Sequence, residues 1–315
     1  MNNIIKELSL YGIVPVVKIE RIEDALPLAK ALCDGGLPLA EVTFRTPCAK
    51  EAIQIMKKNF PEMLIGAGTV LNPQQVDEAI EAGSQFIVSP GLNPQVVQYC
   101  LDKNMSVIPG CATPSDMEKA MTLGLDTVKF FPAEANGGIK AIKAMSAPYG
   151  NLKFMPTGGI NTQNINAYLA CDQIIACGGT WMVSQELIRN RQWDQITQIT
   201  KEAVTAMLDI KIHHVGIGSH DRGQELCSLI NYSQYKQNDT TTMIDCIEIL
   251  ENVNPQQLDY ICLSTKTMER AKFFLQKQGY SFDESSAIYD QNNKLQSICF
   301  CKLISGYRCY LQLED

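Results

Sequence analysis

Polar side chains alternate with apolar ones in the segment LAEVTFR (39–45). A strand there would place Glu41, Thr43 and Arg45 on one face, because successive side chains of a strand point to opposite sides. An arginine suits a bidentate grip on a carboxylate, and a glutamate can transfer protons. We therefore interpret this face as part of a site. The structural alternative is an interior ion pair that only shapes the protein.

Lys129 lies in a second segment of this kind, TVKFFPA (127–133). On a strand it would share a face with Phe131 and point into the interior. Desolvation beside aromatic rings disfavours the ammonium form, so this lysine could supply a neutral amine that condenses with a ketone. The alternative is a structural lysine neutralised by Glu41. Because no histidine precedes residue 213, proton transfer here falls to a carboxylate, a lysine, a tyrosine or water, and Glu41 is the placed candidate.

Two glycine pairs, Gly158-Gly159 and Gly178-Gly179, are predicted to follow the last two strands of the same region. The loops after the seventh and eighth strands of a barrel form its usual phosphate site, because backbone N–H groups and a helix N-terminus can surround an anion. Glycine also makes ordinary turns. Two pairs at these positions nevertheless favour a phosphorylated ligand.

Eight short apolar segments must position these residues, and each is followed by a segment of helical periodicity. They are IVPVVKI (13–19), LAEVTFR (39–45), LIGAGTV (64–70), FIVSPG (86–91), SVIPGC (106–111), TVKFFPA (127–133), KFMPTGG (153–159) and IIACGGTW (174–181). Helical segments such as NPQQVDEAIEAGS and TPSDMEKAMTLGL begin with Asn or Thr followed by Pro. The pattern predicts an α/β fold, a (β/α)8 TIM barrel. A doubly wound open sheet is the alternative, but the dinucleotide glycine fingerprint is missing.

Composition narrows the class of protein. The chain has 315 residues, 27 Lys+Arg against 34 Asp+Glu, a net charge of −7 and 45% hydrophobic residues. These values are typical of a globular protein of about two domains and argue against a nucleic-acid partner. The N-terminus resembles neither an export signal nor a membrane span, so we expect a cytoplasmic protein with no membrane partner. The 12 cysteines form no CxxC pair, and we expect reduced thiols.

The pattern changes near residue 210, which predicts two domains, 1–209 and 210–315. The second contains a weak internal repeat. KIHHVGIGS and CIEILEN in the first copy correspond to LDYICLST and CYLQLED in the second. We expect a smaller α+β domain of paired, degenerate modules.

The motifs EVTFRT, GAGTVLNPQQ, SPGLNP, VKFFPAEANGG, PTGGI and GGTWMV resemble the family of 2-keto-3-deoxy-6-phosphogluconate (KDPG) and 4-hydroxy-2-oxoglutarate aldolases, over residues 1–208. The resemblance implies a class I lyase of Entner–Doudoroff carbohydrate metabolism. Such an enzyme cleaves the phosphorylated keto-acid to pyruvate and glyceraldehyde 3-phosphate through a Schiff base, as a homotrimer, with no cofactor and no metal.

The resemblance also implies residue roles. Lys129 would form the imine, and Glu41 would shuttle protons. The expected substrate contacts are Arg45 and Thr69 for the carboxylate, Pro90 and Phe131 as walls of the pyruvyl pocket, Thr157 for the hydroxyls, and Gly158, Gly159, Gly178, Gly179 and Thr180 for the phosphate.

HHVGI and CIEILEN resemble the glyoxalase or vicinal-oxygen-chelate superfamily, built from paired βαβββ modules. That resemblance maps metal ligands to His214 and Glu248. The matching positions of the second module, Tyr260 and Leu311, are poor ligands for a divalent metal. We therefore expect no catalytic metal here, and a structural, oligomerisation or small-molecule-sensing role.

Three alternatives stay open. The same chemistry would serve 4-hydroxy-2-oxoglutarate or 2-dehydro-3-deoxy-6-phosphogalactonate. A non-catalytic sensor of phosphorylated sugar acids could act through the second domain. The second domain could also be an enzyme of glyoxalase type.

Overall fold

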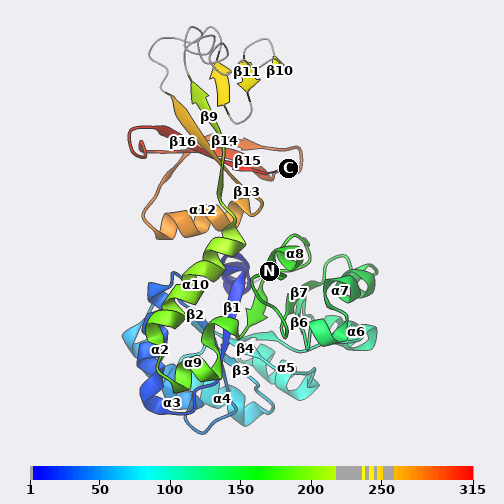
Figure 1. The fold of residues 1–315 in the computed structure, drawn as a ribbon. Coiled ribbons are helices and arrows are strands. Elements are labelled where there is room, and N and C mark those ends of the chain that lie inside the picture. Colours follow the sequence, from blue (N-terminus) through cyan, green and yellow to red (C-terminus); the bar gives the residue numbers. More distant parts are fainter. Residues whose placement is uncertain (1–2, 218–235, 238–240, 245–246, 251–258, 315) are drawn as a thin grey trace. The chain divides into compact units, whose positions relative to one another are not determined.

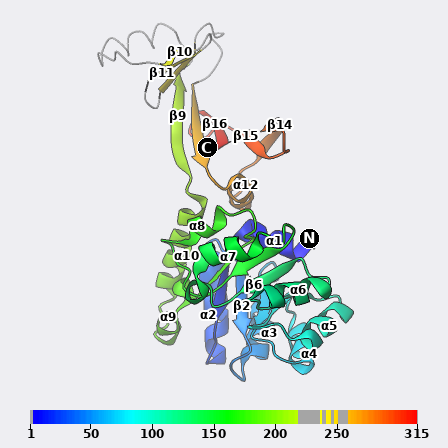
Figure 2. The same cartoon turned by 90° about the vertical axis from the view of Figure 1, so that its right-hand side faces the viewer.

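The computed structural model describes residues 3–217, 236–237, 241–244, 247–250 and 259–314. The chain divides into two compact units, Met1–Met207 and Leu208–Asp315. Figures 1 and 2 show the elements of each.

Parallel strands form the centre of the first unit. They are β1 (Ile13–Val17), β2 (Leu39–Thr43), β3 (Leu64–Gly68), β4 (Phe86–Val88), β5 (Ser106–Ile108), β6 (Thr127–Phe130), β7 (Lys153–Pro156) and β8 (Cys177–Gly179). Six pair in the order β5-β4-β3-β2-β1-β8, and β6 pairs with β7. Isolated bridges join Gly110 to Lys129 and Thr157 to Gly178. Because the last strand pairs with the first, the sheet curls instead of lying open.

Helices alternate with these strands and surround them in both views (Figures 1 and 2). They are α1 (Asn3–Tyr11), α2 (Ala25–Asp34), α3 (Ala49–Asn59), α4 (Pro73–Ala82), α5 (Pro94–Asp102), α6 (Pro114–Thr122), α7 (Gly138–Ser146), α8 (Ile165–Leu169), α9 (Gln185–Arg189) and α10 (Trp193–Leu208), with the 3-10 helices η1 (Ile22–Asp24), η2 (Glu134–Asn136) and η3 (Trp181–Val183). The predicted helix starts are confirmed for α4 and α6. Asn72 caps α4, Thr113 and Asp116 form a capping box on α6, and Pro follows each cap.

Burial explains the near-continuous apolar character of the strands. Every residue of β1, β2 and β3 is buried, as expected for parallel strands covered on both faces. A buried polar residue in these strands therefore stands out from its surroundings.

Each strand of the first unit ends earlier than its apolar segment suggested, and two cases bear on the site. The segment 39–45 is a strand only to Thr43, because the chain turns there and the Arg45 N–H donates to the Thr43 carbonyl at 2.8 Å. The segment 174–181 is a strand only at Cys177–Gly179. Strand alternation therefore does not extend to Arg45, and its position on the face of Glu41 stays a prediction.

The second unit is mainly β. Its strands are β9 (Lys211–Ile217), β10 (Lys236–Gln237), β11 (Thr241–Ile244), β12 (Ile247–Leu250), β13 (Tyr260–Thr265), β14 (Phe282–Tyr289), β15 (Leu295–Phe300) and β16 (Arg308–Leu313), with helix α12 (Met268–Lys277). One sheet has the order β10-β11-β12-β9-β13-β16-β15-β14. At its centre β9 is parallel to β12, β13 is parallel to β16, and β9 is antiparallel to β13. The two halves of this sheet thus follow the internal repeat.

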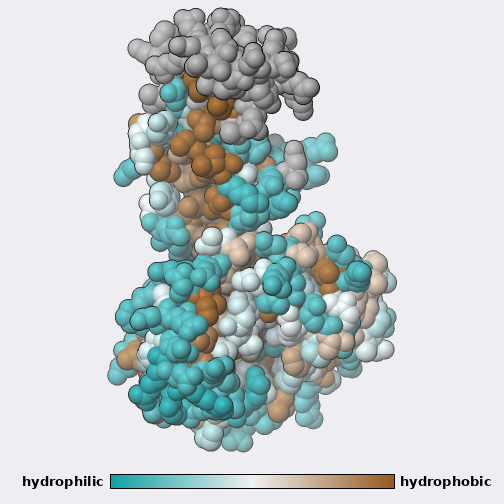
Figure 3. Space-filling model, viewed as in Figure 1, coloured by the Kyte–Doolittle hydropathy of each residue, from teal (hydrophilic) through white to brown (hydrophobic). Residues whose placement is uncertain are grey.

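Surface character differs between the units. Figure 3 shows hydrophobic residues over the middle of the second unit, whereas the visible face of the first is mostly hydrophilic. Ile212 and Ile288 of the second unit have 68% and 61% of their surface exposed. Among the described helices, none is long and apolar enough to cross a membrane.

Seven of the ten described cysteines are buried, two are half-buried and Cys301 is exposed. None of these ten is in a disulfide. Burial raises the pKa of the Cys100 and Cys111 thiols to about 12, so both stay protonated at neutral pH.

Candidate active site

A buried ion pair connects two strands that are far apart in the sequence. Lys129 on β6 and Glu41 on β2 are 6% and 1% exposed. The Lys129 Nζ donates a hydrogen bond to Glu41 Oε1 at 3.2 Å. The ammonium also lies 5.4 Å from the centre of the Phe131 ring. An amine and a carboxylate in direct contact inside a largely apolar core form a pair that can exchange a proton.

The second oxygen of Glu41 has no partner. Glu41 Oε2 is buried and forms no hydrogen bond within the part of the chain that the structure describes, and the same holds for Thr157 Oγ1 at the end of β7. Buried polar atoms normally have partners, because an unmade hydrogen bond costs about 1–3 kcal/mol. Each of the two atoms is therefore a candidate hydrogen-bond partner for a polar ligand.

The Glu41 side chain lies against Gly68, in space that a Cβ atom at residue 68 would fill. A Cβ added at Gly68 on β3 would lie 2.3 Å from Glu41 Oε1 and 2.7 Å from its Cγ. Any larger residue would therefore push the carboxylate away from Lys129. The neighbouring strand thus sets the position of the Glu41 side chain.

Thr69, directly after β3, has an unusual backbone. Its φ is +58°, a left-handed conformation that β-branched residues rarely adopt. Such strain, about 1–3 kcal/mol, is typical of functional sites. The conformation supports the expectation that Thr69 contacts the substrate.

We expect Thr69→Gly to separate stability from activity. Glycine relieves the left-handed strain, which offsets the entropy it adds to the unfolded chain, so the free energy of unfolding should change by less than about 1 kcal/mol. The Michaelis constant should rise about tenfold with the loss of one hydroxyl contact. Urea denaturation and steady-state kinetics test this, with Thr69→Ser, which keeps the hydroxyl, as the control. An unchanged Michaelis constant in Thr69→Gly would remove Thr69 from the site.

The other expected contacts lie on loops after the strands. Arg45 is exposed beyond the end of β2. Pro90 follows β4 and is exposed, and Phe131 directly follows β6 and is 38% exposed. None of these three is held in the pleat of a strand, so their contact with a substrate stays a prediction.

The glycine pairs differ in structure. Gly158 and Gly159 follow β7 with φ of +102° and +82°, which only glycine adopts without strain. Gly178 and Gly179 belong to β8 itself, and Thr180 is the exposed residue after it. The prediction that the second pair follows its strand is wrong. The bridge between Thr157 and Gly178 nevertheless brings the two segments side by side.

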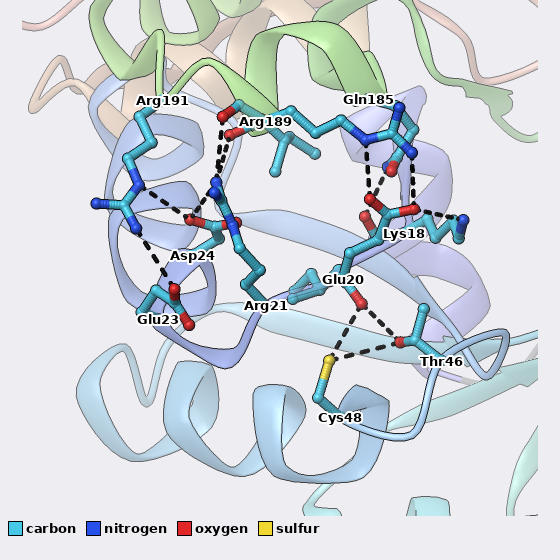
Figure 4. Close-up of polar contacts among 12 residues, drawn as sticks. Lys18, Glu20, Arg21, Glu23, Asp24, Thr46, Cys48, Gln185, Arg189 and Arg191 are labelled. Carbon is cyan, nitrogen blue, oxygen red and sulfur yellow. Dashed lines mark hydrogen bonds and ion pairs between the residues drawn. The ribbon is translucent and has the colours of Figure 1, made fainter.

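A network of polar contacts fixes the loop after β1 (Figure 4). Glu20 accepts hydrogen bonds from Lys18 at 2.7 Å and from Arg189 of α9 at 2.8 and 3.0 Å. Thr46 and Cys48, beyond β2, both donate to the Ile19 carbonyl, at 2.6 and 3.2 Å. The loop is thereby tied to the segments that follow β2 and β8, at the same ends of the strands as the site.

This network predicts a dependence of stability on pH. Hydrogen bonds from Arg189 and Lys18 lower the pKa of Glu20 from 4.5 to about 2. The folded protein therefore gains stability from Glu20 fully above pH 4.5, and this contribution is lost as the pH falls towards 2. The difference in unfolding free energy between the parent and Glu20→Gln should shrink over that range in urea titrations. Glu51→Gln, at an exposed position on α3, is the control. An equal fall in the difference in unfolding free energy for Glu51→Gln would contradict the prediction.

The second unit brings its own polar side chains together. His214 on β9 lies 3.2 Å from Glu248 on β12, and its Nε2 is 3.3 Å from the Tyr260 hydroxyl. The Tyr260 hydroxyl also donates to Glu248. Burial raises the pKa of Tyr260, followed by the effect of that hydrogen bond to Glu248, so the hydroxyl stays protonated. His214 and Glu248 therefore meet, as the resemblance implied.

The match of Leu311 to Glu248 is wrong. In the first half of the sheet, Glu248 pairs with Gly216, which lies two residues after His214. In the second half, Tyr310 pairs with Cys262, which lies two residues after Tyr260. The residue that corresponds to Glu248 is therefore Tyr310. Leu311 is fully buried on the other side of the strand. Tyr310 instead stacks edge-on against Tyr260.

Two residues of this cluster were not predicted from the sequence. His213 and Cys262 lie beside His214, and one ligand atom from each of the three lies within 4.8 Å of the others. The consecutive histidines and the Tyr-x-Cys spacing were visible in the sequence. A regular strand, however, would have placed His213 on the opposite face.

Comparison with known proteins gives consistent matches to the first unit. The model of the family described as KDPG and KHG aldolase matches residues 2–199. The 2-dehydro-3-deoxy-phosphogluconate aldolase of Haemophilus influenzae is 47% identical over 201 residues, which are 64% of this chain and 95% of that protein. The KHG/KDPG aldolase of Escherichia coli K12 is 45% identical over 61% of this chain and 90% of its own.

A solved structure is also similar. The KDPG aldolase of Legionella pneumophila, with pyruvate captured as a covalent carbinolamine, is 39% identical and gives a TM-score of 0.61. The match covers 63% of this chain and 97% of that chain.

Proposed function

This chain belongs to the KDPG and KHG aldolase family, and on that premise we propose that Lys129 and Glu41 carry the Schiff-base cleavage of 2-dehydro-3-deoxy-6-phosphogluconate to pyruvate and D-glyceraldehyde 3-phosphate. The chain is a carbon–carbon lyase of class I. The observation that carries the assignment of residues is the buried contact of 3.2 Å between Lys129 Nζ and Glu41 Oε1.

Imine formation uses both members of the pair. Glu41 accepts a proton from the Lys129 ammonium, and the free amine adds to the C2 carbonyl of the substrate to give a carbinolamine. Proton transfer through Glu41 then expels the former carbonyl oxygen as water and leaves a protonated imine. No cofactor takes part, because the protonated imine is itself the electron sink.

Cleavage uses Glu41 as a base. It removes the proton from the C4 hydroxyl, the C3–C4 bond breaks, and its electron pair moves into the imine to form an enamine. Glyceraldehyde 3-phosphate leaves as the aldehyde. The proton is returned to C3, and addition of water to the imine releases pyruvate and regenerates the Lys129 amine.

The remaining contacts extend from this centre. Arg45 and Thr69 bind the carboxylate, and Pro90 and Phe131 form the walls of the pyruvyl pocket. The unpartnered Thr157 hydroxyl supports a contact with the substrate hydroxyls. The phosphate lies at Gly158, Gly159, Gly178, Gly179 and Thr180, where the backbone N–H groups of the Gly158-Gly159 turn suit an anion.

Substrate choice is tested by comparing kcat/KM for three keto-acids. We expect the phosphogluconate derivative to be preferred over 4-hydroxy-2-oxoglutarate, because the positive-φ Gly158-Gly159 turn suits a phosphate. The 4-hydroxy-2-oxoglutarate activity is the second candidate, since the matching family and the Escherichia coli relative carry both names. Equal or higher kcat/KM for 4-hydroxy-2-oxoglutarate or for the galactonate epimer would reverse the choice.

The wider organisation is also part of the proposal. Residues 1–209 form a closed (β/α)8 barrel, supported by the bridges at both sides of the β6-β7 pair. The barrel assembles as a homotrimer in the cytoplasm, where the unbridged buried thiols remain reduced.

Residues 210–315 form a glyoxalase-like domain, supported by the repeated pairing of β9 with β12 and of β13 with β16. A sensor without catalysis is disfavoured by the intact Lys129–Glu41 pair.

A further inference from the structure

An irregularity between β9 and β13 places two consecutive histidines beside each other. Cys262 pairs with His214. The next pair in register is Leu263 with Ile212, which leaves His213 as the extra residue of a β-bulge. As a result the Nδ1 atoms of His213 and His214 lie 2.6 Å apart, with the ring centres 4.9 Å apart.

Cys262 completes a set of three donors. Its side chain lies across from His214 and is 3% exposed, and the three donor atoms lie within 4.8 Å of one another. In a tetrahedral zinc site, bonds of about 2.0–2.3 Å put the donor atoms roughly 3.3–3.6 Å apart. To reach that spacing the two imidazoles must move apart, and Cys262 Sγ must give up its hydrogen bond of 3.2 Å to Gln312 Oε1.

The other nitrogen of His214 is already held. Its Nε2 lies 3.2 Å from the Glu248 carboxylate and 3.3 Å from the Tyr260 hydroxyl. A histidine that binds a metal through one nitrogen usually donates its other N–H to a carboxylate, which fixes the ring. Glu248 is therefore positioned to orient the His214 ring in this way.

A hard divalent cation does not fit at Glu248. The Tyr260 hydroxyl donates to this carboxylate and contacts His214 Nε2, so it fills the space between the two groups. Tyr310, where a second carboxylate could stand, is a phenol. Two imidazoles and a thiol are soft or borderline donors, which select zinc over magnesium or calcium.

We propose that His213, His214 and Cys262 bind one zinc ion, with Glu248 orienting His214 and a water molecule in the fourth position. The exposed His213 side leaves that position open to solvent. Binding releases the Cys262 proton and forms the zinc–sulfur bond without any change of oxidation state.

Metal titration of the full chain tests the site. Zinc alone, added to protein treated with a chelator, should bind at one equivalent per chain. Cobalt(II), used as a spectroscopic substitute, should give tetrahedral d–d bands and a thiolate-to-cobalt charge-transfer band. Cys262→Ser should lose that band, whereas Cys309→Ser, a buried cysteine of the same sheet, should keep it.

Two further variants keep the result interpretable if Cys262→Ser does not fold. His213→Ala, at an exposed position, should weaken zinc binding on the order of 100-fold or more, and Glu248→Gln only about 10–100-fold. Aldolase activity of the same samples reports the fold of the first unit separately. A charge-transfer band that survives Cys262→Ser, zinc binding unchanged in His213→Ala, or no stoichiometric zinc would each overturn the proposal.

Discussion

Replacing Lys129 by methionine is expected to lower kcat/KM for 2-dehydro-3-deoxy-6-phosphogluconate on the order of 10⁴-fold or more. Methionine keeps the length and apolar stem of lysine but has no nitrogen, so neither the carbinolamine nor the imine can form. Losses of this size accompany the removal of other covalent nucleophiles. Steady-state kinetics, with pyruvate release coupled to its reduction, measure the change.

Stability provides the control for this variant. Lys129→Met leaves the buried Glu41 carboxylate without its cation, which costs about 3–5 kcal/mol of unfolding free energy. The double variant Lys129→Met/Glu41→Gln removes both charges and should recover most of that loss while staying inactive. Urea denaturation separates the two effects. Appreciable turnover by folded Lys129→Met would exclude Lys129 as the nucleophile.

Glu41→Gln should lower kcat by about 10²–10⁴-fold, the usual contribution of a general acid–base group. Glutamine keeps the shape and a hydrogen bond but cannot accept or release the proton needed at each step. Binding should change less, because Arg45 and Thr69 hold the substrate carboxylate in the proposed site. Parallel measurement of kcat and KM tests this split.

Gly68→Ala offers an independent test of the same role. The new methyl group would lie 2.3 Å from Glu41 Oε1, the atom that contacts Lys129, so the carboxylate must move while its charge is kept. We expect a fall in kcat in the same direction as in Glu41→Gln. Full activity in both variants would assign proton transfer to another group.

Strand periodicity was sufficient to place Glu41 and Lys129 in the interior, where they form an ion pair, but not to place the residues around them. Glu41 and Lys129 lie in the middle of short buried strands, where side-chain alternation is reliable. Arg45 lies two residues beyond the end of β2, where the chain turns and the alternation no longer applies. The left-handed backbone of Thr69 also has no signal in local composition, because threonine normally avoids it.

The second unit shows a different limit. The internal repeat indicated two similar halves, and the strand pairings follow them. Register, however, could not be read from the repeat, since a shift of one residue exchanges the two faces of a strand. A shift of one residue is the difference between Leu311, which the repeat suggested as the counterpart of Glu248, and Tyr310, which the pairing gives. The bulge at His213 likewise depends on the pairing of β9 with β13, two strands that are distant in sequence.

Borohydride reduction of the full chain in the presence of pyruvate tests the central claim most directly. Pyruvate alone suffices to form the imine, so the result does not depend on the distal half of the substrate. Reduction fixes the imine as a secondary amine, and intact mass with peptide mapping locates it. The account predicts one pyruvate-derived adduct per chain, on Lys129, and none in Lys129→Met. The absence of any adduct in folded protein, or its presence on another lysine, would contradict the Schiff-base assignment.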